Sequence, residues 1–277
     1  MKLRSLTTRA AVAGAATAML AGGLVATTAT SAHAVEDSTD YTCAVPVLGD
    51  TTFNLVISTP VIPATATAGQ SFPGGLLSLT ATLTIPAPTG AALASYGVDH
   101  ADASDYGIGL GSTKIGAPIS FDEVVVNEDG SATANGAAAN KPFSLPKAGN
   151  YKALVPSAFT LDTEVDLGGG PTPISIKCTT DAPGDLGSVA VTKGNSVTAA
   201  KAGKKGKATV TVDRPDDDVT PAGKVTAKLG KKTYTETLKK GKATFSFGKA
   251  AKGKKVVFTY KGDGFTKGSK SEKITLK

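Results

Sequence analysis

Short runs in which large apolar residues alternate with small or polar ones recur along this chain, and a glycine or proline soon follows each run. Residues 77–85 alternate leucine and isoleucine with serine, threonine and alanine, and residues 256–260 and 244–247 follow the same rhythm. A period of two is typical of a half-buried β-strand, because successive side chains point to opposite faces. Only residues 89–96 have the composition of a helical turn or two. The sequence therefore predicts an all-β protein.

The charge of the chain changes sign near residue 184. Residues 35–183 hold 15 acidic residues and 5 lysines, whereas residues 184–277 hold 22 basic and 8 acidic residues. Predicted short strands with turn signals fill both segments, at a spacing typical of β-sandwiches. We therefore predict two tandem β-sandwich domains, an acidic one at 35–183 and a lysine-rich one at 184–277. The contrast also predicts that the basic domain meets an anionic partner.

Residues 1–34 have the pattern of a secretory signal peptide. Lysine and arginine make the first nine residues positive, residues 10–26 are small and apolar, and Ala-His-Ala at 32–34 is a small-x-small cleavage site. We expect cleavage after Ala34 and a secreted, extracellular protein, with an uncleaved membrane anchor as the alternative. No later run approaches the ~20 apolar residues that a membrane helix needs, so no membrane span is expected.

The chain has two cysteines, Cys43 and Cys178. In an exported chain, two thiols most simply form one disulfide. This bridge would tie the first strand of the acidic domain to its last. A redox or metal-binding pair is the alternative, although the spacing offers neither a CxxC motif nor clustered ligands.

Motifs that would identify a catalyst do not stand out. The chain lacks Gly-x-Ser-x-Gly, His-Glu-x-x-His and a phosphate-binding glycine loop. The segment most suggestive of chemistry contains Asp99, His100, Asp102 and Asp105, which could together hold a cation; a solvated polar loop is the competing interpretation. We expect no enzyme activity, no catalytic residue and no cofactor. A ligand-binding or hydrolytic acidic domain, with the basic domain as a targeting appendage, is the alternative.

Lysines of the basic domain gather at predicted turns, and Lys-Lys-Gly-Lys-Ala-Thr occurs twice, beginning at Lys204 and Lys239. Turns of a sandwich collect at its two ends, so several clusters can share one surface suited to an anionic envelope polymer. Two alternatives stay open: a solvated surface that protects strand edges, and weak docking against an acidic domain. Nucleic acid is not an expected partner, because aromatic residues are not interleaved with the lysines. The candidate polyanion-binding residues are Lys204, Lys205, Lys207, Lys231, Lys232, Lys239, Lys240, Lys242, Lys252, Lys254 and Lys255.

The acidic domain resembles an uncharacterised domain of secreted actinobacterial proteins. The resemblance is carried by Tyr-Thr-Cys at 41–43, Pro46, Gly49 and Ile-Lys-Cys at 176–178, and it covers roughly residues 40–180. It implies export and closure by the two cysteines. It implies no activity.

The basic domain resembles bacterial Ig-like domains of group 3, which occur in surface and adhesin proteins. The matching segments are Pro-Ala-Gly-Lys-Val at 221–225, Gly-Lys-Ala-Thr-Phe at 241–245 and Tyr-Lys-Gly-Asp at 260–263, ahead of Ser269. The aromatic that follows falls at Phe265, one residue earlier than is usual in that family. The resemblance implies an Ig-like sandwich that acts as a spacer or binding module. We therefore expect a secreted, non-enzymatic protein that associates with the cell envelope or mediates adhesion through this domain.

Overall fold

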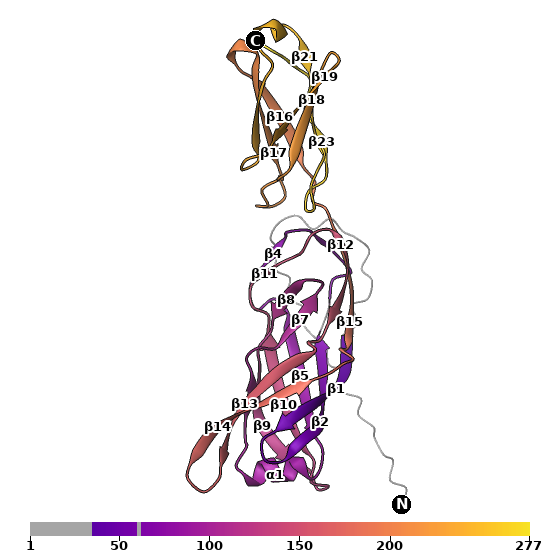
Figure 1. Ribbon diagram of the computed structural model, residues 1–277. Helices are drawn as coiled ribbons and strands as arrows, with labels where there is room; N and C mark the ends of the chain where they lie inside the picture. The colour runs from indigo at the N-terminus through magenta and orange to yellow at the C-terminus, as the bar shows by residue number, and fades with distance from the viewer. Residues whose placement is uncertain (1–34, 60–61) are drawn as a thin grey trace, which may run out of the picture. The chain divides into compact units, whose positions relative to one another are not determined.

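The computed structural model describes residues 35–59 and 62–277, so the predicted signal peptide lies outside the described residues. Strands predominate, and α1 (Thr89–Ser95) is the single α-helix of the described part (Figure 1). The all-β prediction is confirmed. No described helix combines the length and the apolar character that crossing a bilayer requires.

The first domain is built on a closed antiparallel sheet of eight strands, whose interior is filled by large side chains such as Tyr41, Phe53, Phe121 and Phe159. The two-sheet sandwich predicted for this domain is wrong, because β1 pairs with both β2 and β14 and so leaves no free edge. Alternation alone does not distinguish the two folds, since each buries one face of every strand. In order around the sheet the strands are β1 (Val35–Val45), β14 (Pro171–Thr179), β13 (Ala158–Asp166), β6 (Ala101–Ala103), β9 (Ile119–Val126), β10 (Ala132–Ala139), β5 (Ser78–Ile85) and β2 (Gly49–Thr59).

A second sheet and a short ribbon complete this domain and share its apolar core. The ribbon consists of β4 (Ser71–Phe72) and β11 (Phe143–Ser144). The five strands of the second sheet are, in order, β3 (Thr65–Thr67), β15 (Asp185–Thr192), β12 (Gly149–Leu154), β7 (Gly107–Leu110) and β8 (Thr113–Gly116).

Strand β15 moves the domain boundary. It pairs with β12 and β3, and its residues Leu186, Val189 and Val191 are buried in the core of the first domain. The first domain therefore extends to about residue 192, past the boundary expected at 183/184. Asp185 is the single charged residue of β15. Assigning this strand to the first domain therefore leaves the first domain acidic and the second domain basic.

The predicted disulfide is confirmed. Cys43 and Cys178 are bonded, and both are fully buried. They are register partners where β1 meets β14, at the seam that closes the eight-stranded sheet. The bridge therefore fastens the first strand of that sheet to its last in chain order.

The second domain consists of two larger antiparallel sheets and one two-stranded sheet around one apolar cluster, to which Val210, Val225, Phe245 and Phe258 belong. Two 3₁₀ turns, η1 (Lys204–Gly206) and η2 (Lys249–Ala251), connect strands at one end. One sheet has β16 (Val197–Ala202), β17 (Lys207–Asp213) and β20 (Lys242–Ser246); the other has β19 (Lys232–Thr237), β18 (Lys224–Leu229), β22 (Phe258–Tyr260) and β23 (Ser269–Lys270), and β21 (Lys255–Val256) pairs with β24 (Ile274–Thr275).

A buried arginine bonds across the join between the domains. Arg214 follows β17 and is only 2% exposed. Its Nη1 donates to the carbonyl oxygens of Ala68 at 3.0 Å and Phe265 at 2.9 Å, and its Nη2 pairs with Asp217. A side chain at Gly194 would collide with the guanidinium group. None of the candidate lysines takes part in this contact, which sequence reasoning did not anticipate.

Candidate functional site

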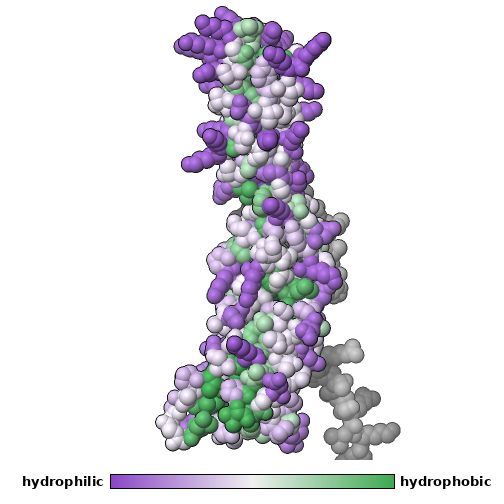
Figure 2. Space-filling model, viewed as in Figure 1, coloured by the Kyte–Doolittle hydropathy of each residue, from purple (hydrophilic) through white to green (hydrophobic). Residues whose placement is uncertain are grey.

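The structure divides the candidate lysines between the two ends of the second domain. At one end, backbone hydrogen bonds link η1, η2 and the last residues: the Phe247 N–H donates to the Gly206 carbonyl at 2.9 Å, and the Gly206 N–H donates to the Lys277 carbonyl at 2.8 Å. Figure 2 shows hydrophilic side chains crowded over this end. The lysines on these turns and on the strand ends beside them are Lys204, Lys205, Lys207, Lys231, Lys232, Lys252, Lys254 and Lys255, joined by Lys249.

The other three candidates lie at the opposite end, in the turn between β19 and β20. Lys242 is the register partner of Thr211 near the end of β17, whereas Lys207 begins that strand. The two copies of the Lys-Lys-Gly-Lys-Ala-Thr motif therefore stand at opposite ends of one domain. Lys239, Lys240 and Lys242 form this separate group.

Four lysines from separate segments line one open groove of about 540 Å³ on the second domain. They are Lys228 in β18, Lys255 in β21, Lys270 in β23 and Lys273 just before β24, and all four are exposed. No carboxylate lies among the lining residues. We name this surface the lysine groove; its full lining is Thr226, Lys228, Lys255, Val256, Val257, Thr259, Lys270 and Lys273.

The lysine groove concentrates uncompensated positive charge. Within 35–59 and 62–277, the ion pairs are His100–Asp99, Lys152–Asp185 and Arg214–Asp217, and none involves a groove lysine. Ammonium groups held on one surface repel each other, and an anion in the groove relieves that repulsion. A lysine offers three donors and a point charge, which suits phosphate oxygens of varied geometry.

Sequence reasoning found Lys255 but missed Lys228, Lys270 and Lys273. Lys255 belongs to a cluster of lysines at a turn, which was the signal used, whereas the other three lysines stand alone in or beside strands. Alternation within the predicted strand 224–229 would place Lys228 on an outer face. The pairing of β18 with β22, and of β22 with β23, brings the other lysines of the groove close to Lys228. No local sequence pattern predicts those pairings.

The three carboxylates of the suggested cation site, Asp99, Asp102 and Asp105, each bond to a different partner. Asp99 binds the ring Nδ1 of His100 at 2.7 Å, Asp102 accepts from the Ser120 hydroxyl at 2.7 Å, and Asp105 accepts from the backbone N–H of Thr160 at 3.0 Å. The described residues contain no group of three or more His, Cys, Asp or Glu side chains placed to hold a metal ion. The hydrogen bond to the Asp99 carboxylate raises the pKa of His100 above its ordinary value.

The first domain, with its disulfide-closed sheet, corresponds to a known sequence family. The model of a family of unknown function, DUF6801, matches residues 40–188, more than half of the chain. The chain belongs to this family. The DUF6801 match spans both cysteines and runs into β15, in agreement with the placement of that strand in the first domain. No match was found among the curated proteins.

The DUF6801 match and the lysine groove do not overlap. Every residue of the groove lies beyond residue 188, in the second domain. Membership of DUF6801 therefore describes the first domain and assigns no role to the groove.

Proposed function

We propose that this chain is an exported, non-enzymatic protein that binds an anionic polymer of the cell envelope through its second domain. The lysine groove is the observation that carries the proposal, since four exposed lysines converge there with no carboxylate among them. The pattern of residues 1–34 supports export. The Cys43–Cys178 bridge supports an oxidising compartment, where disulfides form and persist.

We also propose that the second domain is Ig-like. Two antiparallel sheets around a single apolar cluster support this proposal. So does Asp263 of the Tyr-Lys-Gly-Asp segment, whose carboxylate accepts backbone N–H groups from Ala222, Phe265 and Thr266. The segment that carries the sequence resemblance thus has a structural task in the loop that follows β22.

Binding at the lysine groove is electrostatic. Each polymer phosphate that meets a lysine releases condensed counterions, so affinity falls as salt rises. Lys252 and Lys254 directly precede Lys255 of the groove, so a long polymer can continue from the groove onto the end that carries η1 and η2. A linear polyanion fits this path better than a small anion, which would meet only part of it.

The test uses inorganic polyphosphate and isolated actinobacterial cell walls with residues 35–277. The triple variant K228Q/K270Q/K273Q removes three groove charges, and K239Q/K240Q/K242Q removes three charges at the other end of the same domain. At low salt we expect the groove variant to bind polyphosphate at least about tenfold more weakly, given ~0.5–1 kcal/mol per lysine. We expect the control to stay within about threefold of the wild type, because its lysines lie away from the groove.

Equal losses in both variants would show diffuse attraction to net charge and would overturn the groove as the site. Absence of binding to walls even at low salt would overturn polymer binding altogether. Salt-resistant binding to walls by residues 35–192 would instead favour the alternative, a ligand-binding or hydrolytic first domain. Measuring binding at several salt concentrations separates these outcomes, because only electrostatic binding to a polyanion weakens steeply as salt rises.

A further inference from the structure

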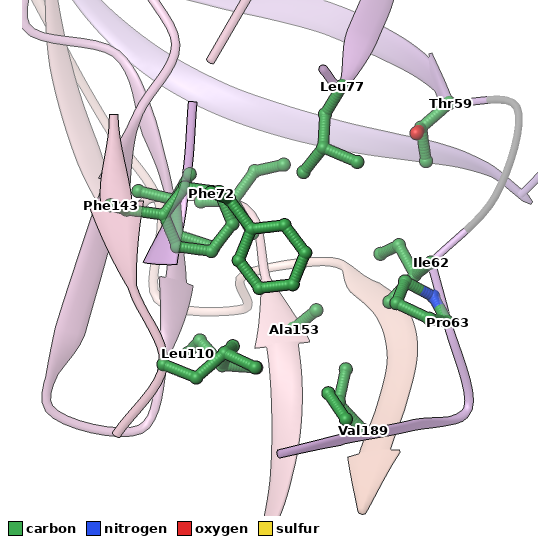
Figure 3. Close-up of a pocket in the computed structure, with 13 residues that line it drawn as sticks. Thr59, Ile62, Pro63, Phe72, Leu77, Leu110, Phe143, Ala153 and Val189 are labelled. Carbon is green, nitrogen blue, oxygen red and sulfur yellow. The ribbon is translucent and has the colours of Figure 1, made fainter. Parts of the chain in front are cut away.

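The first domain contains an apolar pocket that the proposed polymer binding does not use. It has a volume of about 60 Å³ and lies between the five-stranded sheet, the ribbon of β4 and β11, and the end of β2. Figure 3 shows Phe72 and Ile62 on opposite sides of the space, with Ala153 of β12 and Val189 of β15 also facing it. We name it the apolar cavity.

Carbon atoms line the apolar cavity almost completely. Thr59 is the one lining residue with a polar side-chain atom, and it is 1% exposed. A buried water needs two to four polar partners, so a space of this kind stays dry. The residues that line it include no titratable side chain, so they offer nothing for proton transfer or for nucleophilic attack. A ligand in the cavity is held by apolar contact alone.

The walls of the apolar cavity differ in exposure. Ile108, Ala153 and Val189 form a buried floor, whereas Phe72 and Phe143 are half-buried. The two phenylalanine rings stack with centroids 5.0 Å apart, and the strands that carry them pair with each other as a two-stranded ribbon. Their side of the cavity meets solvent, and a ligand reaches the buried floor from there.

The size of the cavity selects the shape of its ligand. An engineered apolar cavity of about 150 Å³ binds benzene, and this one has about 60 Å³, too little for an aromatic ring. The end of an unbranched chain fits, and the chain can continue along the stacked rings of Phe72 and Phe143. We propose that the apolar cavity binds the terminal carbons of the alkyl chain of a single-chain lipid, whose headgroup stays in solvent.

The binding test uses dodecanoate below its micelle concentration with residues 35–277, and dodecyl maltoside as an uncharged probe with the same chain. We expect one molecule of either probe to bind, with chemical-shift changes at the methyl groups of Ile108 and Val189. The affinity should stay within about twofold between low and physiological salt, because apolar contact is not screened. Binding of dodecanoate alone, or shifts confined to lysines, would overturn the proposal in favour of charge attraction.

Variants that fill the cavity make the assignment specific. Ala153→Leu adds volume at the buried floor, and Ala66→Leu adds it from the half-buried β3 side, where added volume is tolerated even if the first variant does not fold. Each should weaken binding of both probes at least tenfold. Ala139→Leu makes the same change at an exposed position of β10 outside the cavity and should bind as the wild type does.

Wild-type affinity in both folded filling variants would overturn the assignment to this cavity. Failure of this proposal leaves polymer binding untouched, because the two sites share no residue. The groove variant K228Q/K270Q/K273Q should keep its affinity for both alkyl probes, and Ala66→Leu should keep its affinity for polyphosphate. The two proposals are therefore separable in one set of proteins.

Discussion

At the scale of single residues, a few polar side chains each satisfy several backbone groups in the loops. Asn140 is 3% exposed; its amide nitrogen donates to the carbonyls of Pro73 and Lys141, and its oxygen accepts from the Leu77 N–H at 2.7 Å. Asp263 and Arg214 act in the same way in the second domain. Buried backbone groups need partners, and each of these side chains supplies two or three at once.

Replacement of Asp263 should destabilise the second domain. Burial raises the pKa of this carboxyl, but the N–H groups of Ala222, Phe265 and Thr266 outweigh burial and hold the pKa below its ordinary value. Asp263→Ala should therefore lower the free energy of unfolding by about 2 kcal/mol at pH 7, measured by urea denaturation. Because the folded pKa is the lower one, this stabilisation is present above the unfolded pKa and is lost as pH falls through the folded value. The account would be contradicted if the difference in unfolding free energy between variant and wild type were as large at acidic pH as at pH 7.

The pair Asp99–His100 gives a direct titration test. The hydrogen bond that His100 donates to the Asp99 carboxylate raises the pKa of His100, so Asp99→Asn should lower the pKa of that imidazole in an NMR titration. A raised folded pKa means that the stabilisation is fully present below the unfolded pKa and disappears as pH rises through the folded value. His100 is the one histidine of residues 35–277, so its signals need no further assignment. An unshifted His100 in the variant would show that solvent screens this exposed pair.

Arg214 should be costly to replace. Arg214→Met keeps a long side chain, but it leaves the carbonyls of Ala68 and Phe265 without their donor and Asp217 without its cation. We expect a loss of about 3 kcal/mol in the free energy of unfolding, measured by urea denaturation. Lys201→Met, at an exposed position of β16, is the control and should change stability by less than about 0.5 kcal/mol. Equal effects of the two substitutions would mean that the buried bonds contribute nothing.

At the scale of elements, the closed eight-stranded sheet and the sheets of the second domain differ in their strand edges. The eight-stranded sheet closes and has no free edge. The two larger sheets of the second domain end in β16, β20, β19 and β23, and each of these strands carries an exposed lysine, in turn Lys201, Lys242, Lys232 and Lys270. Edge lysines discourage strand-to-strand pairing between molecules. We propose that part of the lysine excess of the second domain protects these open edges, apart from any polymer.

Neutralising these edges should promote self-association without unfolding. The variant K201Q/K232Q/K242Q/K270Q should show concentration-dependent light scattering at protein concentrations where the wild type remains monodisperse. Its unfolding free energy should stay within about 1 kcal/mol of the wild type, because exposed substitutions change stability little. If the variant remained monodisperse, these lysines would not be needed to prevent strand pairing between molecules. The two triple variants of the polymer test each remove one edge lysine, Lys270 or Lys242, so light scattering should be recorded for both.

At the scale of the whole molecule, sequence reasoning succeeded where the signal was local. Alternation over residues 77–85 predicted a strand, and β5 is found at Ser78–Ile85. The pairing of Cys43 with Cys178 followed from there being only two cysteines. The closed sheet, the place of β15 in the first domain and the lysine groove depend on which strands pair across long stretches of chain. Local sequence patterns do not predict such pairings, because any two strands with alternating apolar residues can present an apolar face to the same core.

Loss of the disulfide should destabilise the whole first domain. The bridge joins residues 135 apart in the chain, and closing a loop of that length removes unfolded-state entropy worth about 4–5 kcal/mol in the simple chain model. Cys43→Ser/Cys178→Ser should therefore lower the urea midpoint of the first domain, measured by the NMR signals of His100, which is the one histidine of residues 35–277 and lies in that domain. The apparent midpoint of the second domain should change little, since it has its own apolar cluster. An equal decrease in the urea midpoints of both domains would show that they unfold as one unit.

The seam between β1 and β14 also sets an order of events as the chain is made. β1 is the first described strand to emerge, yet its partner β14 ends at Thr179. The eight-stranded sheet can therefore close only after most of the chain has left the machinery that synthesises or translocates it. Until then the strands already made can pair only as an open sheet, in which the edge of β1 that β14 will occupy stays unpaired. A free strand edge is a template for pairing with another chain, so this edge is exposed to wrong partners until β14 arrives.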